Sequence, residues 1–227
     1  MESKAGTLWR KVGDREQIMY NQDREILFIH IPKTAGRAVA EVFGVKSHPH
    51  LSYIQAESFY NLESKEKKPY TFTFIRDPHD RFVSCFKQLL GKPYKRSFEK
   101  FKNFTPSEFR SWVKLVWFPH YSGKDIQVND KRMQEWVISN MDPLSPHGFN
   151  PDTYSIWLKN NNNNFDSIDQ MLDFRNPLSE MKLLNMKLNS RDNLRLQNLE
   201  LSKIRESNLG SYSHFWDSES KEMFESL

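Results

Sequence analysis

Residues 26–38 constrain the fold more than any other part of the chain. Five of the six residues from Ile26 to Ile31 are apolar, which predicts a strand that is buried on both faces. Pro32 cannot donate a hydrogen bond to a neighbouring strand, so the strand is expected to stop there. The segment therefore predicts a buried strand that leads directly into a tight loop.

The loop after this strand has the composition of an anion-binding turn. Lys33 is its cation, and the residues that follow, up to Gly36, are small. Residues 37–43 suit a short helix, and a tight turn before a helix leaves backbone N–H groups pointing outward, where they bind anions. An ammonium group at the mouth of such a turn suits phosphate or sulfate. An ordinary strand, turn and helix with a solvated lysine fits the same residues, so both interpretations stay open here.

Composition narrows the class of protein. The 227 residues carry a net charge of +4 with a pI near 9.0, which favours a partner with phosphate, sulfate or carboxylate groups. The single cysteine, Cys85, excludes an internal disulfide and a cysteine-rich metal site. Residues 1–21 lack the apolar run of a signal peptide, and no stretch approaches the length of a membrane span. We expect a soluble, cytoplasmic protein; the alternative is an excised luminal domain.

Alternation of strands and helices predicts the fold class. Residues 70–75 are aromatic and β-branched, which predicts a second strand. Helices are expected after each strand, over residues 37–43 and 53–62 and over residues 79–90. Such βαβ units favour an α/β fold with a central, mainly parallel sheet flanked by helices. We expect a single domain over residues 1–227, with a loosely packed N-terminal arm at 1–24 and the principal binding core at 25–90.

The second half is expected to be mainly helical. Thr105 to Glu108 form a capping box with proline at the first helical position, which predicts a helix through Val116. Another helix is expected over 130–140, followed by a loop over 141–152. Residues 165–175 are expected to contain a late strand, and a helix is expected from Pro177 to about Leu188. Trp112, Trp117 and Trp157 are interpreted as core residues, as is Cys85.

A second motif begins where the second strand ends. Arg76 lies at the junction of strand and helix, and Ser84 lies eight residues later. A guanidinium and a hydroxyl together can hold a second phosphate. Asp77, Asp80 and Arg81 are interpreted as structural: the carboxylates near the positive end of the helix dipole and the arginine in a surface ion pair.

The two motifs together resemble those of a known family. Residues 28–36 resemble the 5′-phosphosulfate loop of the carbohydrate sulfotransferases of the heparan 2-O and chondroitin type. Residues 72–84 resemble the 3′-phosphate motif of the same family, and the two motifs occur here in the family's order. The similarity is clearest over residues 25–90. It is weaker over residues 146–152 and fainter over residues 172–175 and 207–216.

The resemblance implies a P-loop-like fold and 3′-phosphoadenosine 5′-phosphosulfate as the sulfuryl donor, with no metal required. It assigns Lys33 to the bridging and sulfuryl oxygens, and Arg76 and Ser84 to the 3′-phosphate. The 5′-phosphosulfate would be held by the backbone of Thr34, Ala35, Gly36, Arg37 and Ala38. Arg37 departs from the family, which usually has threonine or serine at this position. Either a hydroxyl contact is lost there or the guanidinium replaces it as an anion ligand.

Sulfuryl transfer also requires a base for the acceptor hydroxyl, and histidine suits this role near neutral pH. His50 is the first candidate, because the family places a histidine in the loop after the first helix. His48 is the alternative base, and His147 is a candidate for contacting the acceptor. His30, inside the first strand, is expected to be a core residue or to support the loop.

The acceptor and the rival functions remain open at this stage. The expected acceptor is a hydroxyl of a glycan or small metabolite. A nucleotide kinase is disfavoured because no G-x-x-x-x-G-K-[ST] motif is present. A non-catalytic polyanion-binding module is the other alternative, although no nucleic-acid-binding motif is visible. A basic stretch after the second motif is either a solvated face or a rim that attracts an anionic acceptor; its residues are Lys87, Lys92, Lys95, Arg96, Lys100 and Lys102.

Overall fold

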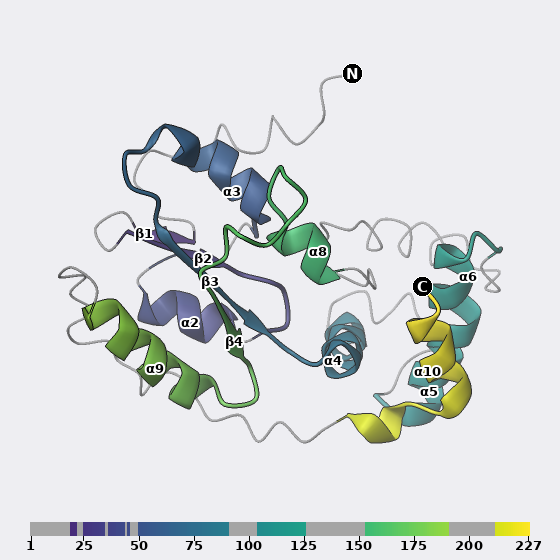
Figure 1. The fold of residues 1–227 in the computed structure, drawn as a ribbon. Helices are drawn as coiled ribbons and strands as arrows, with labels where there is room; N and C mark the ends of the chain where they lie inside the picture. The colour runs from purple at the N-terminus through teal and green to yellow at the C-terminus, as the bar shows by residue number, and fades with distance from the viewer. Residues whose placement is uncertain are drawn as a thin grey trace.

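A four-stranded sheet in the order β1-β2-β3-β4 forms the centre of the protein (Figure 1). This computed structural model describes residues 19–21, 25–34, 36–43, 45, 50–90, 104–125, 153–190 and 212–227. The strands are β1 (Tyr20–Asn21), β2 (Ile26–Ile29), β3 (Tyr70–Ile75) and β4 (Gln170–Asp173). β1 runs antiparallel to β2, whereas the β2–β3 and β3–β4 pairs are parallel. The predicted helix at 130–140 and loop at 141–152 lie outside the described residues.

Helices cover both faces of this sheet, which confirms the predicted α/β fold (Figure 1). Successive side chains of a strand point to opposite faces. Phe28 and Phe72 therefore pack in a cluster with α2 (Gly36–Val42) and α9 (Pro177–Ser190). Leu27 and Ile29 pack on the other face, with α3 (Tyr53–Tyr60) and α8 (Thr153–Leu158). A short 3-10 helix, η2 (Leu62–Ser64), follows α3.

A third apolar cluster lies beyond the carboxyl end of β3. α4 (Pro78–Leu90) lies between the sheet and a group of helices that includes the C-terminal one (Figure 1). This group consists of α5 (Pro106–Trp112), the π-helix η4 (Val113–Trp117), α6 (Phe118–Tyr121), the 3-10 helix η6 (Ser213–Phe215) and α10 (Ser218–Glu225). Phe82 of α4 packs with Trp112 and Trp117 in this cluster. Both tryptophans, like Trp157, are fully buried, as predicted.

Most predicted elements agree with the structure to within a few residues, but β1 was not predicted. Tyr20 and Asn21 pair with Leu27 and Ile26, and Met19 and Tyr20 are buried. The expectation of a loosely packed arm is therefore wrong at these residues. A strand of two residues has too few positions to show an alternating pattern, so only its pairing with β2 identifies it.

Candidate functional site

The loop after β2 has the tight backbone predicted for it. Lys33 has a φ of 73°, a left-handed conformation that is unfavourable for a residue with a side chain and that is frequent at functional sites. The hydroxyl of the buried Thr34 donates a hydrogen bond of 2.8 Å to the carbonyl oxygen of Ile31. This bond closes the turn around Lys33. The Thr34 side chain therefore supports the loop, and backbone N–H groups remain the candidate anion ligands.

Gly36 is required at the start of α2 because a histidine ring fills the space beside it. A Cβ atom at this position would lie 1.7 Å from Cδ2 and 1.9 Å from Nε2 of His30. The His30 ring is itself held between Phe28 and His50, with ring centroids 5.6 and 4.2 Å away. His30 is thus a buried residue that supports the loop, as predicted.

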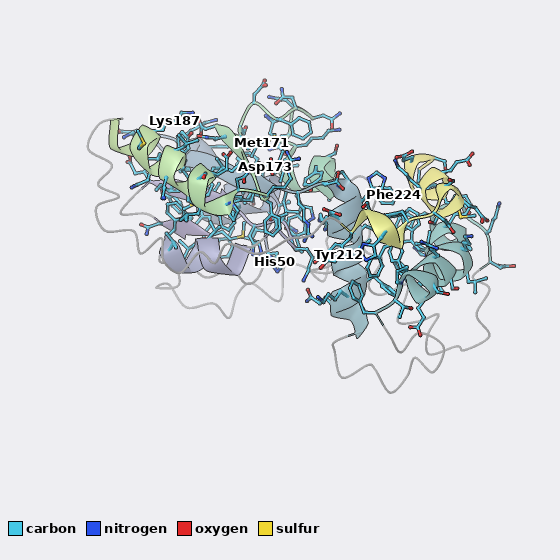
Figure 2. All side chains as sticks on the ribbon, turned by 90° about the horizontal axis from the view of Figure 1, so that it is seen from below. His50, Met171, Asp173, Lys187, Tyr212 and Phe224 are labelled. Carbon is cyan, nitrogen blue, oxygen red and sulfur yellow. The ribbon has the colours of Figure 1, made fainter. Side chains whose placement is uncertain are left out.

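Arg76 follows the last residue of β3 and is 7% exposed. Its guanidinium carbon lies 4.9 Å from the ring centroid of Phe174 and 5.5 Å from that of Tyr212. Figure 2 labels Tyr212 at the boundary between the sheet and the helical group, close to α4. Within the described part of the chain, the Nη2 atom of Arg76 is buried without a hydrogen-bond partner. A buried cation with an unused donor suits an anionic ligand.

Positive charges from both motifs lie near the side chain of Cys85 in α4. Burial raises the pKa of the Cys85 thiol in α4. The charges that oppose this rise are those of Arg81, Lys33 and Arg76. The buried Ser84 precedes Cys85 on the same helix. The lysine of the first motif and the arginine of the second therefore lie near one segment of α4.

The prediction that Arg81 forms a surface ion pair is wrong. Arg81 is 3% exposed, and its Nε–H donates a hydrogen bond of 3.1 Å to the carbonyl oxygen of Pro32. The prediction for the two carboxylates is closer to the structure. Asp77 caps α4, because its side chain accepts a hydrogen bond from the N–H of Asp80. The side chain of Asp80 in turn accepts a hydrogen bond of 2.8 Å from the N–H of Tyr212.

His50 lies directly against the loop-supporting histidine. Its Nδ1 is 3.2 Å from the carbonyl oxygen of His30, and its ring is 6.2 Å from that of Trp157. A carbonyl oxygen only accepts, so this contact is a hydrogen bond when Nδ1 carries the proton. The neutral ring then has its lone pair on Nε2, which is the tautomer that suits a base.

Several predicted site residues lie outside the described residues. These are Ala35, His48 and His147. Arg37 and Ala38 belong to α2, but their side chains are not described. The effect of Arg37 on binding of the 5′-phosphosulfate therefore stays a prediction. The structure describes six of the predicted site residues. The first motif and its flanks contribute Lys33, Thr34, Gly36 and His50, and the second motif contributes Arg76 and Ser84.

A cavity of about 480 Å³ lies at the opposite edge of the sheet. It is lined by residues around the amino ends of β2 and β3, among them Glu25, Lys67 and Thr71. Glu25 and Lys67 form an ion pair of 2.7 Å there. None of the motif residues that the structure describes lines this cavity, so it is separate from the described part of the candidate site.

Comparison with protein families shows the family of the chain. A model of the sulfotransferase family matches residues 16–176, which include both motifs and all four strands of the sheet. The chain belongs to the sulfotransferase family. No curated protein and no solved structure matched it in the corresponding comparisons. Within the described ranges, no helix of this sulfotransferase combines the length and the apolar character needed to cross a membrane.

Membership in the sulfotransferase family supports transfer of a sulfuryl group to a hydroxyl acceptor. Three residues around Arg76 were not predicted to take part in the site: Tyr154, Phe174 and Tyr212. Tyr154 follows the segment of weaker family similarity at residues 146–152, and Phe174 and Tyr212 lie within the fainter segments at 172–175 and 207–216, which was the available signal. The burial of Arg81 could have been predicted more directly from the sequence. Arg81 and Cys85 are four residues apart, so they share one face of α4, and Cys85 was expected to be buried.

Proposed function

We propose that this protein transfers the sulfuryl group of 3′-phosphoadenosine 5′-phosphosulfate to a hydroxyl of a carbohydrate or a similar acceptor. The observation that carries the proposal is the buried Arg76, whose Nη2 has no hydrogen-bond partner among the described residues. The charges of Arg76 and Lys33 both oppose the rise in the pKa of Cys85, so both cations lie near one segment of α4. Two cations near one helix suit a donor with two anionic groups. The donor supplies an activated sulfuryl group when it is bound.

Each part of the site has a defined role in this proposal. Lys33 stabilises negative charge on the bridging and sulfuryl oxygens, and backbone N–H groups of residues 34–38 hold the 5′-phosphosulfate. Arg76 and Ser84 hold the 3′-phosphate. Because Arg76 and Lys33 are both placed by the ends of adjacent parallel strands, the two anion sites are organised before a ligand binds. The burial of Arg76 strengthens its hydrogen bonds to a phosphate.

His50 is the proposed base. With the Nδ1 proton hydrogen-bonded to the His30 carbonyl oxygen, Nε2 would take the proton of the acceptor hydroxyl while the acceptor oxygen bonds to sulfur. The bond between sulfur and the 5′-phosphate oxygen would break, and 3′,5′-phosphoadenosine would leave. The His30 carbonyl then stabilises the imidazolium that forms. His48 remains the alternative base, and His147 remains a proposed acceptor contact. The basic stretch that begins at Lys87 is the proposed rim for an anionic acceptor.

The proposal is tested by thermal stabilisation with 3′,5′-phosphoadenosine, ADP, and ATP with magnesium. A ligand at 100 times its dissociation constant adds about 2.7 kcal/mol to the free energy of unfolding. We expect a selective upward shift in Tm with 3′,5′-phosphoadenosine. A preference for ATP with magnesium would instead indicate a nucleotide kinase. A protein that responds to none of the three would be better described as a polyanion-binding module.

A further inference from the structure

The hydrogen bonds of β3 alternate between its two neighbours. The N–H of Tyr70 donates to the carbonyl oxygen of Glu25, on the β2 side. The carbonyl oxygen of Ile75 accepts from the N–H of Phe174, on the β4 side. In a strand, the N–H and C=O groups of one residue point to the same neighbour and those of the next residue point to the other. Arg76 follows Ile75, so its backbone groups face the β2 side.

Beyond the end of β2, the described residues that follow it give the backbone of Arg76 no hydrogen-bond partner. The parallel register pairs Ile29 with Thr73, so continuing it by three residues would pair Pro32 with Arg76. Tyr70, which is paired with Ile26, donates to the residue before it, Glu25. By the same pattern, the N–H of Arg76 would donate to the carbonyl oxygen of Ile31, and its carbonyl oxygen would accept from the N–H of Lys33. The carbonyl oxygen of Ile31 accepts from the hydroxyl of Thr34 instead. The chain also turns away at Lys33, whose φ is 73°. Two backbone groups of a 7% exposed residue therefore need another partner.

Tyr154 of α8 meets both backbone groups of Arg76 with one hydroxyl. Its oxygen accepts a hydrogen bond of 3.0 Å from the N–H of Arg76, and its O–H donates to the carbonyl oxygen of the same residue. Burial raises the pKa of the Tyr154 phenol, so it stays protonated and able to donate. α8 is held in place by Trp157 and Leu158, which are both fully buried under the sheet.

We propose that Tyr154 is a positioning residue for Arg76, completing β3 where the β2 ladder ends and so fixing the guanidinium for the 3′-phosphate of the donor. The inference rests on the proposed function. Tyr154 holds the backbone of Arg76, whereas Phe174 and Tyr212 flank its guanidinium. Without the phenol oxygen, the backbone N–H and C=O groups of Arg76 lose their hydrogen-bond partner. The backbone from which the arginine side chain extends is then no longer fixed.

The test is Tyr154→Phe, which removes one oxygen atom and keeps the ring. Binding of 3′,5′-phosphoadenosine and of adenosine 5′-monophosphate is measured by calorimetry on the full chain. We expect the variant to bind 3′,5′-phosphoadenosine about tenfold more weakly, because a misplaced arginine makes poorer charged hydrogen bonds. Its affinity for adenosine 5′-monophosphate, which has no 3′-phosphate, should change by less than about twofold.

Tyr53→Phe is the matched control. Tyr53 is a buried tyrosine of α3, on the same face of the sheet, and its hydroxyl donates to Oε1 of Glu57 at 3.0 Å. Its substitution should reduce stability to a similar degree without changing the preference for the 3′-phosphate. If both variants lose the preference equally, the effect is general destabilisation and the positioning role is overturned.

A double-mutant comparison keeps the test decisive if Tyr154→Phe is unstable. In an Arg76→Ala background, Tyr154→Phe should have no further effect on the preference for the 3′-phosphate, because the residue it positions is absent. An additive effect in that background overturns the inference. Wild-type preference in the Tyr154→Phe single variant also overturns it and leaves the proposed function intact. A wild-type protein without any preference for the 3′-phosphate would overturn the proposed function itself.

Discussion

The guanidinium Nε–H of Arg81 donates a hydrogen bond to the carbonyl oxygen of Pro32 across 3.1 Å. This bond joins α4, which carries Ser84, to the residue that precedes Lys33. The two motifs are therefore physically connected and not merely adjacent. Because Arg81 is 3% exposed, water competes little for this bond. A substitution of Arg81 should therefore change the conformation of the loop that contains Lys33.

Arg81→Lys should keep the positive charge and lose the Nε–H that holds the Pro32 carbonyl. We expect the free energy of unfolding to fall by about 1–3 kcal/mol, the range for a buried group that loses its partner. The affinity for 3′,5′-phosphoadenosine should also fall, by about fivefold or more, because the loop is no longer held. Urea denaturation and calorimetry measure the two quantities.

Arg110→Lys is the matched control for this experiment. Arg110 also donates from Nε to a backbone carbonyl, that of Phe215 at 2.9 Å, but it belongs to α5 and has no place in either motif. Arg110→Lys should reduce stability and should lower nucleotide affinity less than Arg81→Lys does. Equal losses of affinity in the two variants would show that Arg81 has no specific link to the loop.

Arg76→Lys should show that the site needs a guanidinium and not only a positive charge. Lysine cannot form the planar, two-pronged contact with a phosphate, and it stacks less well between Phe174 and Tyr212. We expect a loss of about 1.5–3 kcal/mol in binding free energy for 3′,5′-phosphoadenosine. Calorimetry at two salt concentrations measures this loss. Unchanged affinity would exclude Arg76 from the 3′-phosphate site.

Gly36→Ala should destabilise the protein although alanine favours helices. The added Cβ would lie 2.4 Å from Cγ of His30, and Phe28 and His50 leave the ring little room to move. Overpacking of this kind costs about 1–3 kcal/mol. In a His30→Ala background the clash is absent, so the same substitution should be neutral or stabilising. Urea denaturation of the four proteins provides the comparison, and an equal cost in both backgrounds would refute the steric explanation.

His50→Gln should abolish most turnover while leaving donor binding intact. Glutamine has no titratable nitrogen to take the proton of the acceptor, and loss of a general base lowers rates by about 10²–10⁴-fold. Because the glutamine amide can still donate a hydrogen bond toward the His30 carbonyl oxygen, the affinity for 3′,5′-phosphoadenosine should change little. Steady-state kinetics and calorimetry separate these effects. A fully active variant would transfer the role of base to His48.

Asp217 should make stability depend on acid pH. Hydrogen bonds from the side chain and backbone of Ser220 lower the pKa of this carboxyl, with help from the charges of Lys114 and Arg110. A lowered folded pKa means that its stabilisation is complete above the unfolded pKa, about 3.9, and is lost as the pH falls through the folded value. Asp217→Asn keeps a capping oxygen for α10 but removes the charge.

The variant should therefore be less stable than wild type by about 0.5–1 kcal/mol at pH 7. The difference should shrink as the pH falls below about 4, where the wild-type carboxyl becomes protonated. Urea denaturation at several pH values measures this dependence. A stability difference that stays constant from pH 7 to pH 2 would contradict the assignment.

The sequence alone determined the parts of this protein that depend on neighbouring residues. The second strand was predicted over residues 70–75, the bounds that β3 has, because aromatic and β-branched side chains show strand preference within a few residues. Lys33 and Arg76 were also proposed as site residues from local sequence, since Lys33 follows an apolar strand in a tight loop and Arg76 lies where a strand meets a helix, within two motifs that resemble those of one family. The buried tryptophans were also predicted correctly.

Only the tertiary structure decided which side chains surround those two cations. Tyr154 contacts Arg76 from a position 78 residues further along the chain, and Arg81 reaches Pro32 across 49 residues. Such contacts depend on strand register and on how α8 and α4 dock on the sheet, and no local pattern encodes either. The local sequence therefore specified the charges of the site, and the packing of distant helices specified how those charges are held.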